Sequence, residues 1–268
     1  MPLAVCATPI GNLEDVTLRV LRELREADVV LCEDTRRTRV LLDRHGVRGA
    51  RLVSYHEHNE AKRAAELLPR LQAGERVALV SDAGLPGIND PGARLVAAAL
   101  EAGVAVTVLP GASAVETALV ASGLAGEQYR FLGYLPRGAG ALAALWEELR
   151  TWPHASVAFE SPRRLPATLV SLAEADPERP VAVCRELTKQ FEEVVRGTAA
   201  EVAARFPEPP RGEITLVLGG ASASRGDDVA ALAAVGELVE AGTPRRLAAD
   251  VVARLTGVAR NRLYRESL

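Results

Sequence analysis

The sequence is poor in aromatic residues and in cysteine. Aromatic side chains make up only 4% of the 268 residues, so the hydrophobic core must be built mainly from Ala, Val and Leu. The three cysteines, Cys6, Cys32 and Cys184, are odd in number, lie far apart and sit in apolar stretches. This pattern argues against a disulfide framework and against a zinc site. We therefore expect a protein of a reducing compartment, the cytoplasm.

Long apolar runs and several common enzyme signatures are also absent. No run of 18 apolar residues occurs and no leader pattern opens the chain, so we expect neither a membrane span nor a secretory signal. The sequence lacks G-x-G-x-x-G after its first predicted strand, and it lacks G-x-x-x-x-G-K-[ST] and G-x-S-x-G. These absences disfavour a dinucleotide dehydrogenase, a P-loop NTPase and a hydrolase with a serine triad.

Lysine is nearly absent, and the charge is unevenly distributed. Only Lys62 and Lys189 occur, so 30 of the 32 basic residues are arginines, for which a GC-rich genome is the simplest explanation. The net charge is −3, but residues 243–268 hold six arginines against Asp250 and Glu266. That segment carries +4, which leaves −7 for the rest of the chain. A basic tail on an acidic body points to a polyanionic partner.

Residues 1–123 alternate between strand and helix patterns. Predicted strands lie at Leu3–Ala7, Asp28–Cys32, Arg51–Ser54, Val77–Val80 and Val104–Leu109. A helical pattern follows each of them. This alternation requires a mostly parallel sheet with helices on its faces. We therefore assign residues 1–123 to a first α/β domain.

The alternation lapses near Gly123 and resumes differently. Predicted strands lie at Ser156–Glu160, Val181–Arg185, Glu213–Leu218 and, as a further candidate, Phe191–Gly197. We assign residues 124–220 to a second α/β domain that completes a cleft. Residues 221–268 form a linker and a small basic helical domain, with helices predicted at Asp227–Glu240, Arg245–Leu255 and Ala259–Glu266. The fold class is thus α/β, with two α/β domains and a helical extension.

The most informative stretch is Val77–Gly92, a short apolar strand followed by a loop and a helix. The ten residues after Asp82 contain three glycines and two prolines. Ordinary connections between a strand and a helix span about two to six residues, and ligands of open α/β sheets bind outside the strand ends. The loop is either a long plain connection or, as its length favours, one wall of a binding site. A carboxylate at Asp82 could accept hydrogen bonds there, while the glycines let backbone amides approach a ligand.

Similar polar or glycine-rich clusters end the other strands. They are TPIGN (Thr8–Asn12), CEDTR (Cys32–Arg36), SDAGLPGINDPG (Ser81–Gly92), PGASA (Pro110–Ala114), FLGYLPR (Phe131–Arg137), FESPRR (Phe159–Arg164), RELTKQFEE (Arg185–Glu193) and RGEITLVLGG (Arg211–Gly220). If both sheets are parallel, these clusters gather along one edge. The series, which covers essentially the whole chain in order, resembles the ribosomal RNA small subunit methyltransferase I family of the tetrapyrrole-methylase superfamily.

The resemblance implies a function and a cofactor. It implies two α/β domains with S-adenosylmethionine (SAM) between them, a helix-turn-helix-like C-terminal extension and a homodimer. The implied reaction is methylation of the ribose 2′-hydroxyl of a cytidine in the decoding region of 16S rRNA, in the small ribosomal subunit. The expected SAM-binding residues are Asp82, Ala83, Gly84, Leu85, Pro86, Gly87 and Ile88 together with, by analogy, Pro9, Ser113, Ala114, Phe159, Glu160, Arg185, Ile214 and Thr215.

Three residues are candidates for catalysis. Lys189 could act as a general base if burial lowered its pKa, or it could contact an rRNA phosphate. Glu186 could orient Lys189 or pair with Arg185. His56 could serve as a base or a ribose ligand. With His58 alone as a neighbour and no third ligand nearby, no metal site is expected.

Two further pairs leave two interpretations open. Asp34 either caps the following helix or lines the cleft together with Glu33. Arg163 and Arg164 either meet rRNA phosphates or form a solvated surface. For the protein as a whole, the alternatives to an rRNA methyltransferase are a porphyrinoid methylase and an RNA-binding assembly factor without activity. The basic tail and SDAGLP argue against the first alternative, and the dense cofactor motifs argue against the second.

Overall fold

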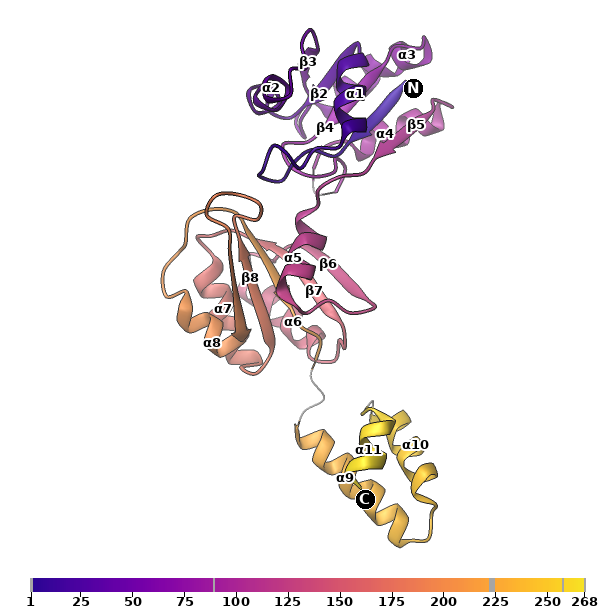
Figure 1. Cartoon of the computed structure of the whole chain (residues 1–268), viewed down its shortest axis with the longest axis vertical. Coiled ribbons are helices and arrows are strands. Elements are labelled where there is room, and N and C mark those ends of the chain that lie inside the picture. The colour runs from indigo at the N-terminus through magenta and orange to yellow at the C-terminus, as the bar shows by residue number, and fades with distance from the viewer. Residues whose placement is uncertain (1, 89, 222–224, 257, 268) are drawn as a thin grey trace. The chain divides into compact units, whose positions relative to one another are not determined.

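The computed structural model describes residues 2–88, 90–221, 225–256 and 258–267 (Figure 1). The chain divides into two compact units. The first unit consists of Met1–Glu148 and His154–Gly219, and the second of Leu149–Pro153 and Gly220–Leu268. The first unit holds two five-stranded sheets, and the second holds helices. The predicted α/β fold class with a helical C-terminal part is therefore confirmed.

The first sheet is parallel throughout, as the alternation predicts. Its strand order is β3-β2-β4-β1-β5. The strands are β1 (Leu3–Cys6), β2 (Val29–Cys32), β3 (Arg51–Ser54), β4 (Val77–Val80) and β5 (Val106–Leu109). The helices between them are α1 (Leu18–Glu26), α2 (Thr35–Arg44), α3 (Glu60–Gln72) and α4 (Ala93–Glu101). The central strands are buried on both faces, which explains why their sequences are almost entirely apolar.

Successive residues of each strand of the first sheet supply two separate cores. Leu3 and Val5 of β1 pack on the side covered by α3 and α4, where Leu67 and Leu95 lie. The intervening Ala4 and Cys6 belong to the core on the other side, which α1 and α2 cover. Side chains alternate between the faces of a strand, so one apolar run serves both cores. The sheet is thereby fixed in the middle of a three-layer arrangement.

The second sheet is mixed, and the expectation of a parallel sheet is wrong here. Its order is β6-β7-β10-β8-β9, and only β6 and β7 run parallel. The strands are β6 (Tyr129–Tyr134), β7 (Ala155–Glu160), β8 (Pro180–Arg185), β9 (Glu193–Thr198) and β10 (Ile214–Leu218). No helix separates β8 from β9, so the two strands form an antiparallel hairpin. Strand β10 also runs antiparallel to both of its neighbours.

The reversal of β10 nevertheless brings the predicted clusters together. Ile214, at the start of β10, pairs with Glu160 at the end of β7 and with Arg185 at the end of β8. The polar residues before β10 therefore lie at the same edge as the polar residues after β7 and β8. The polar clusters of this sheet do gather at one edge, as predicted. The cluster before β10 lies there because β10 begins at this edge, whereas β7 and β8 end at it.

The second sheet is covered by helices from both halves of the chain. The helices α6 (Ala139–Leu149), α7 (Leu165–Ala175) and α8 (Ala199–Arg205) follow strands of this sheet in sequence. Helix α5 (Ala114–Ser122), which follows β5, packs Ala118 and Leu119 into a core with Val157 and Val217 of the second sheet. The domain boundaries after residues 123 and 220 stay predictions. By its packing, α5 belongs with the second sheet.

The C-terminal unit has a hydrophobic core of its own. Helices α9 (Arg225–Glu240), α10 (Arg245–Thr256) and α11 (Arg260–Glu266) bury Val235, Ala249, Val252 and Leu263 together. Residues 222–224 of the predicted linker lie outside the described residues. Among the helices of the described segments, none is long and apolar enough to cross a membrane.

Candidate functional site

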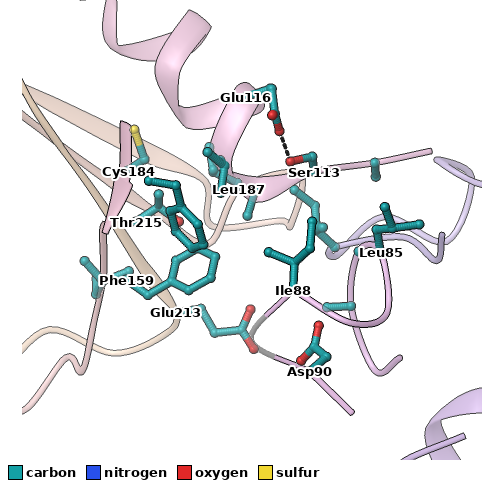
Figure 2. Close-up of a pocket in the computed structure, with 18 of the residues that line it drawn as sticks. Leu85, Ile88, Asp90, Ser113, Glu116, Phe159, Cys184, Leu187, Glu213 and Thr215 are labelled. Atoms are coloured by element: carbon teal, nitrogen blue, oxygen red, sulfur yellow. Dashed lines mark hydrogen bonds between the residues drawn. The ribbon is translucent and has the colours of Figure 1, made fainter. Parts of the chain in front are cut away.

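A cavity of about 930 Å³ lies where the strand-end loops of the two sheets meet (Figure 2). Both halves of the chain contribute, since Asp82 and Ser113 line it from the first half and Phe159 and Thr215 line it from the second. The predicted cofactor residues that line it are Asp82, Ala83, Gly84, Leu85, Ile88, Ser113, Ala114, Phe159, Glu160, Ile214 and Thr215. A volume of this size is typical of a site for a cofactor-sized ligand.

Four predicted cofactor residues do not line the cavity. Pro9 precedes a residue that does, Ile10. Pro86 and Gly87 belong to the same loop, where a side chain on Gly87 would lie 3.5 Å from the backbone nitrogen of Ala93 at the start of α4. The Arg185 side chain turns away along the hairpin, because it donates hydrogen bonds to Glu193 at 3.0 Å and to the Arg211 carbonyl at 3.2 Å.

Backbone hydrogen bonds anchor the β4 loop to the end of β1. The Thr8 amide donates to the Gly84 carbonyl at 2.8 Å, and the Gly84 amide donates back to the Thr8 carbonyl at 3.1 Å. Gly84 has φ +79°, a conformation that glycine adopts without strain. On the β5 side, a side chain on Gly111 would lie 2.8 Å from the Ala7 methyl group. Both glycines permit the close approach of backbones that shapes this wall.

Asp82 lines the cavity but is already engaged by protein donors. Its Oδ1 accepts a hydrogen bond from the Asp34 amide at 3.1 Å, and its Oδ2 lies 3.4 Å from Arg37 Nη1. Asp34 in turn caps α2 by accepting from the Arg36 amide at 2.8 Å. The capping interpretation of Asp34 is confirmed, and hydrogen bonds from the Arg36 side chain and amide lower the pKa of Asp34. Asp82 thus holds the β2–α2 connection beside the cavity.

Three carboxylates gather around this end of the cavity. Burial, together with the charges of Glu33 and Asp82, raises the pKa of Asp90 to about 7. Burial and the Asp82 charge also raise the pKa of Glu33. Close carboxylates disfavour one another's ionised form, and low solvent access strengthens the effect. Residues with such shifts in a cavity are candidates for function.

The opposite wall is aromatic, which the sequence prediction largely missed. Phe159 contacts Phe131 edge-to-face with ring centroids 5.1 Å apart, and it contacts Tyr134 at 5.6 Å. With Tyr129, four of the chain's ten aromatic residues line the cavity. The available signal was their scarcity combined with the FLGYLPR motif. An aromatic wall of this kind suits a planar heterocycle.

Ser113 and Ala114 lie at the N-terminus of α5 and line the cavity, and their contact with the cofactor stays a prediction. Ser113 Oγ donates a hydrogen bond to Glu116, and Tyr129 donates to the same carboxylate at 2.6 Å. These two donors lower the pKa of Glu116. Glu116 was not predicted, although its place one helical turn after Ser113 was a usable signal.

Glu160 is buried and fully occupied within the protein. Its carboxylate accepts from the Ser161 amide at 2.7 Å and from Thr168 at 2.7 Å, and it pairs with Arg164 at 3.2 Å. Arg164 also donates to the Leu135 carbonyl. Arg164 is therefore a structural ion-pair partner beneath the cavity. Arg163 is exposed, and its contact with rRNA stays a prediction.

Lys189 and Glu186 lie beside the cavity, outside its lining. Lys189 Nζ donates to Glu186 and to Glu213, each at 2.9 Å, so Glu186 pairs with Lys189 and not with Arg185. Partial burial acts to lower the pKa of Lys189, but the hydrogen bonds that Lys189 donates to Glu186 and Glu213 outweigh it and raise that pKa. This direction is opposite to the one that a neutral base requires.

The Lys189 loop approaches the β1 loop closely. Glu186 and Thr188 have φ values of +52° and +65°, which are uncommon for residues with side chains. Thr188 accepts a hydrogen bond from the Asn12 amide at 2.9 Å. A side chain on Gly11 would lie 2.8 Å from the Leu187 carbonyl oxygen. This contact joins the two halves of the first unit.

His56 is not part of the cavity lining. Its ring lies 3.1 Å from the Asn59 amide group and 5.8 Å, between centroids, from His58. In the part of the chain that the structure describes, no group of three or more His, Cys, Asp or Glu side chains is placed to hold a metal ion.

Comparison with known proteins gives consistent results. Residues 2–203 match the sequence model of the family described as "Tetrapyrrole (Corrin/Porphyrin) Methylases". Proteins called ribosomal RNA small subunit methyltransferase I are similar over nearly the whole chain. The one from Micromonospora olivasterospora is 46% identical, over 98% of this chain and 85% of its own length. The one from Mesorhizobium japonicum is 44% identical, over 99% and 91%.

Other similar proteins cover less of the chain. The relative of the same name from Thermotoga maritima is 45% identical over 81% of this chain and 98% of its own length. Among solved structures, the methyltransferase CobJ has a TM-score of 0.64 at 21% identity, covering 82% of this chain and 94% of that one. Uroporphyrin-III C-methyltransferase from Thermus thermophilus, complexed with S-adenyl homocysteine, has a TM-score of 0.56 at 23% identity, covering 81% and 96%. The two structures show the same fold.

Proposed function

Because the chain belongs to the ribosomal RNA small subunit methyltransferase I family of tetrapyrrole methylases, we propose that it methylates the ribose 2′-hydroxyl of a cytidine in the decoding region of 16S rRNA. It is a methyltransferase whose cofactor is SAM. The observation that carries the proposal is the cavity of about 930 Å³ lined by the family's motif residues from both sheets.

The residues present fit SAM. Phe131, Tyr134 and Phe159 offer an aromatic wall for an adenine ring. Glu116 stays ionised because two hydroxyl donors lower its pKa, and it can attract the ammonium group. Ala83 and Gly84, which carry no long side chains, also line the cavity.

The cofactor supplies an activated methyl group, so the protein's task is mainly alignment. Reacting groups held in line and close to contact can gain of the order of 7–11 kcal/mol over reactants that meet by diffusion. The anchored Ser81–Gly84 segment and the β10 start provide two fixed walls for this purpose. The cavity opening must also admit a ribose, which requires a nucleotide that is turned out of a helix.

A porphyrinoid substrate is the alternative within the superfamily. The solved porphyrin and corrin enzymes are only 18–23% identical to this chain, whereas the relatives named for rRNA reach 46%. That difference favours rRNA. The homodimer and the cytoplasmic location implied by the resemblance stay predictions.

The test is a ribose-methylation map of 16S rRNA from cells with and without the gene. We expect one decoding-region cytidine to lose its 2′-O-methyl group on deletion and to regain it when the purified protein and SAM are added to the isolated 30S subunits. A map that is unchanged by deletion would contradict the proposal. Methyl transfer from SAM to free uroporphyrinogen, without transfer to 30S subunits, would favour the alternative.

A further inference from the structure

Methylation of a hydroxyl group releases a proton, and the residue that accepts it is not obvious from the motifs. The following inference rests on the proposed function, since it needs a hydroxyl acceptor. Lys189 and His56 do not line the cavity, and the pKa of Lys189 is raised. Cys184 lines it, but burial raises the pKa of its thiol to about 11. Tyr129 and Tyr134 line it too, but the pKa of each hydroxyl is raised. The remaining candidates are carboxylates.

Five carboxylates line the cavity within the described residues, and four of them are occupied by protein donors. Asp82, Glu116, Glu160 and Glu213 each accept a hydrogen bond or lie in an ion pair. Asp82 is engaged by the Asp34 amide and Arg37, and Glu116 by Ser113 and Tyr129. Glu160 is engaged by Ser161, Thr168 and Arg164, and Glu213 by Lys189. These donors occupy carboxylate oxygens that would otherwise be open to a substrate hydroxyl.

Asp90 is the fifth carboxylate, and its surroundings differ. Among the residues that the structure describes, no donor is hydrogen-bonded to it. The titratable groups that face it are Glu33 and Asp82 from the first sheet and Tyr134 and Glu213 from the second. Figure 2 shows the Asp90 and Glu213 side chains with their carboxylates turned toward the same space in the cavity.

We propose that the Asp90 carboxylate is the general base that accepts the proton of the substrate 2′-hydroxyl. In the step, ribose O2′ forms a bond to the methyl carbon as the carbon–sulfur bond breaks and its electron pair returns to sulfur. The O2′ proton passes to Asp90 and then to solvent. A base is most effective when its pKa lies near the working pH, and burial beside Glu33 and Asp82 brings Asp90 there.

The test compares Asp90→Asn, Asp90→Glu and a matched control, Glu101→Gln. Glu101 is an exposed carboxylate at the end of α4, outside the cavity lining. Each variant is saturated with labelled SAM and mixed with 30S subunits that lack the modification, and the single-turnover rate is measured from pH 5.5 to 8.5. SAM affinity is measured in parallel by calorimetry.

We expect Asp90→Asn to lower the rate by about 10²–10⁴-fold while SAM affinity changes less than about threefold. The wild-type rate should rise with pH to a plateau. Its midpoint should lie at or below about pH 7, because the positive charge of bound SAM favours the ionised form of Asp90. Asp90→Asn should lose this rise, Asp90→Glu should regain part of the rate, and Glu101→Gln should match the wild type. An Asp90→Asn rate within threefold of the wild type, with the same pH profile, would overturn the assignment. So would a loss of SAM affinity as large as the loss of rate.

A second measurement needs neither SAM nor rRNA. A carboxylate with a raised native pKa binds more protons in the folded state than in the unfolded state between about pH 4 and 7, so its contribution to stability falls as pH rises. The melting temperature of Asp90→Asn, relative to that of the wild type, should therefore increase from pH 5 to pH 8. A constant difference would contradict the described environment of Asp90. If the wild type instead leaves no 2′-O-methyl group on the subunits, the proposed function fails, whatever Asp90 does.

Discussion

The two walls of the cavity are built on different principles. The wall from the first sheet consists of strand-end loops of a parallel sheet, and backbone hydrogen bonds between Thr8 and Gly84 hold it in place. The wall from the second sheet lies on a mixed sheet, and its buried Glu160, next in sequence to Phe159, forms an ion pair with the partly exposed Arg164. The first wall thus presents backbone groups with Asp82 and Asp90, and the second presents aromatic rings with Glu160 and Glu213.

This difference predicts how each wall responds to mutation. Backbone hydrogen bonds are insensitive to most side-chain changes, so substitutions in the first wall should mainly affect the ligand. A buried charge that loses its partner destabilises the fold itself. Substitutions beneath the second wall should therefore reduce stability before they reduce binding.

The largest effect is expected for Arg164→Met. The Glu160 side chain is 0% exposed, and the change would leave its carboxylate without its cation. Loss of one partner of a buried pair costs about 3–5 kcal/mol, and the 29% exposure of Arg164 places the expected loss near the lower limit, about 3 kcal/mol. Urea denaturation would measure it. The neighbouring Arg163→Met should change the unfolding free energy by less than about 0.5 kcal/mol, and equal losses for both would contradict the ion-pair account.

Asp82→Ala should have the largest effect on the ligand. Without this carboxylate the Asp34 amide and Arg37 lose their partner, and the cavity edge is no longer held. We expect SAM affinity to fall by at least about 100-fold, roughly 2.8 kcal/mol, with little change in the unfolding free energy. Asp82→Asn keeps an oxygen for the Asp34 amide and should lose about tenfold. Calorimetry that finds unchanged affinity for Asp82→Ala would refute this role.

The first wall was the more predictable of the two. A chain that alternates strand and helix must form a mostly parallel sheet, and the excess of glycine in Ser81–Gly92 marked the loop directly. The position of Asp82 followed from these two facts. Its hydrogen bond from Asp34 did not, because that contact joins residues 48 positions apart.

The second wall depends on contacts that local patterns do not encode. Strand β10 lies between β7 and β8 and runs antiparallel to both, and no periodicity specifies either its position or its direction. Phe131 and Phe159 meet only because β6 and β7 pair. A role of Lys189 as a base required burial to lower its pKa, but Glu213, 24 residues away in sequence, contributes to raising it. Contacts between residues far apart in sequence thus determine both the aromatic contacts of this wall and the direction of the Lys189 pKa shift.

The junction between the walls should be less sensitive. In Gly11→Ala the new methyl group would lie 2.5 Å from Lys189 Cγ and 2.8 Å from the Leu187 carbonyl oxygen. The lysine can move, but the carbonyl is backbone, so we expect a loss of about 1–2 kcal/mol, in the lower part of the range for overpacking. Gly138→Ala is the matched control, since nothing lies within 4 Å of the added methyl group. Thermal unfolding of the two variants should differ by several degrees, and identical curves would show that the two loops are not in close contact.

Removal of the C-terminal helices should have the smallest effect on the cavity. The family match ends at residue 203, the Thermotoga maritima relative lacks a counterpart for about a fifth of this chain, and the three helices have a separate core. A chain ending at Gly226 should therefore bind SAM with unchanged affinity. Its affinity for 30S subunits should fall, with a shallower salt dependence, because the arginines of residues 243–268 no longer reach phosphates. Calorimetry for SAM and filter binding for subunits at two salt concentrations separate these expectations. A truncated protein that binds subunits as tightly and with the same salt slope would assign rRNA docking to the α/β unit alone.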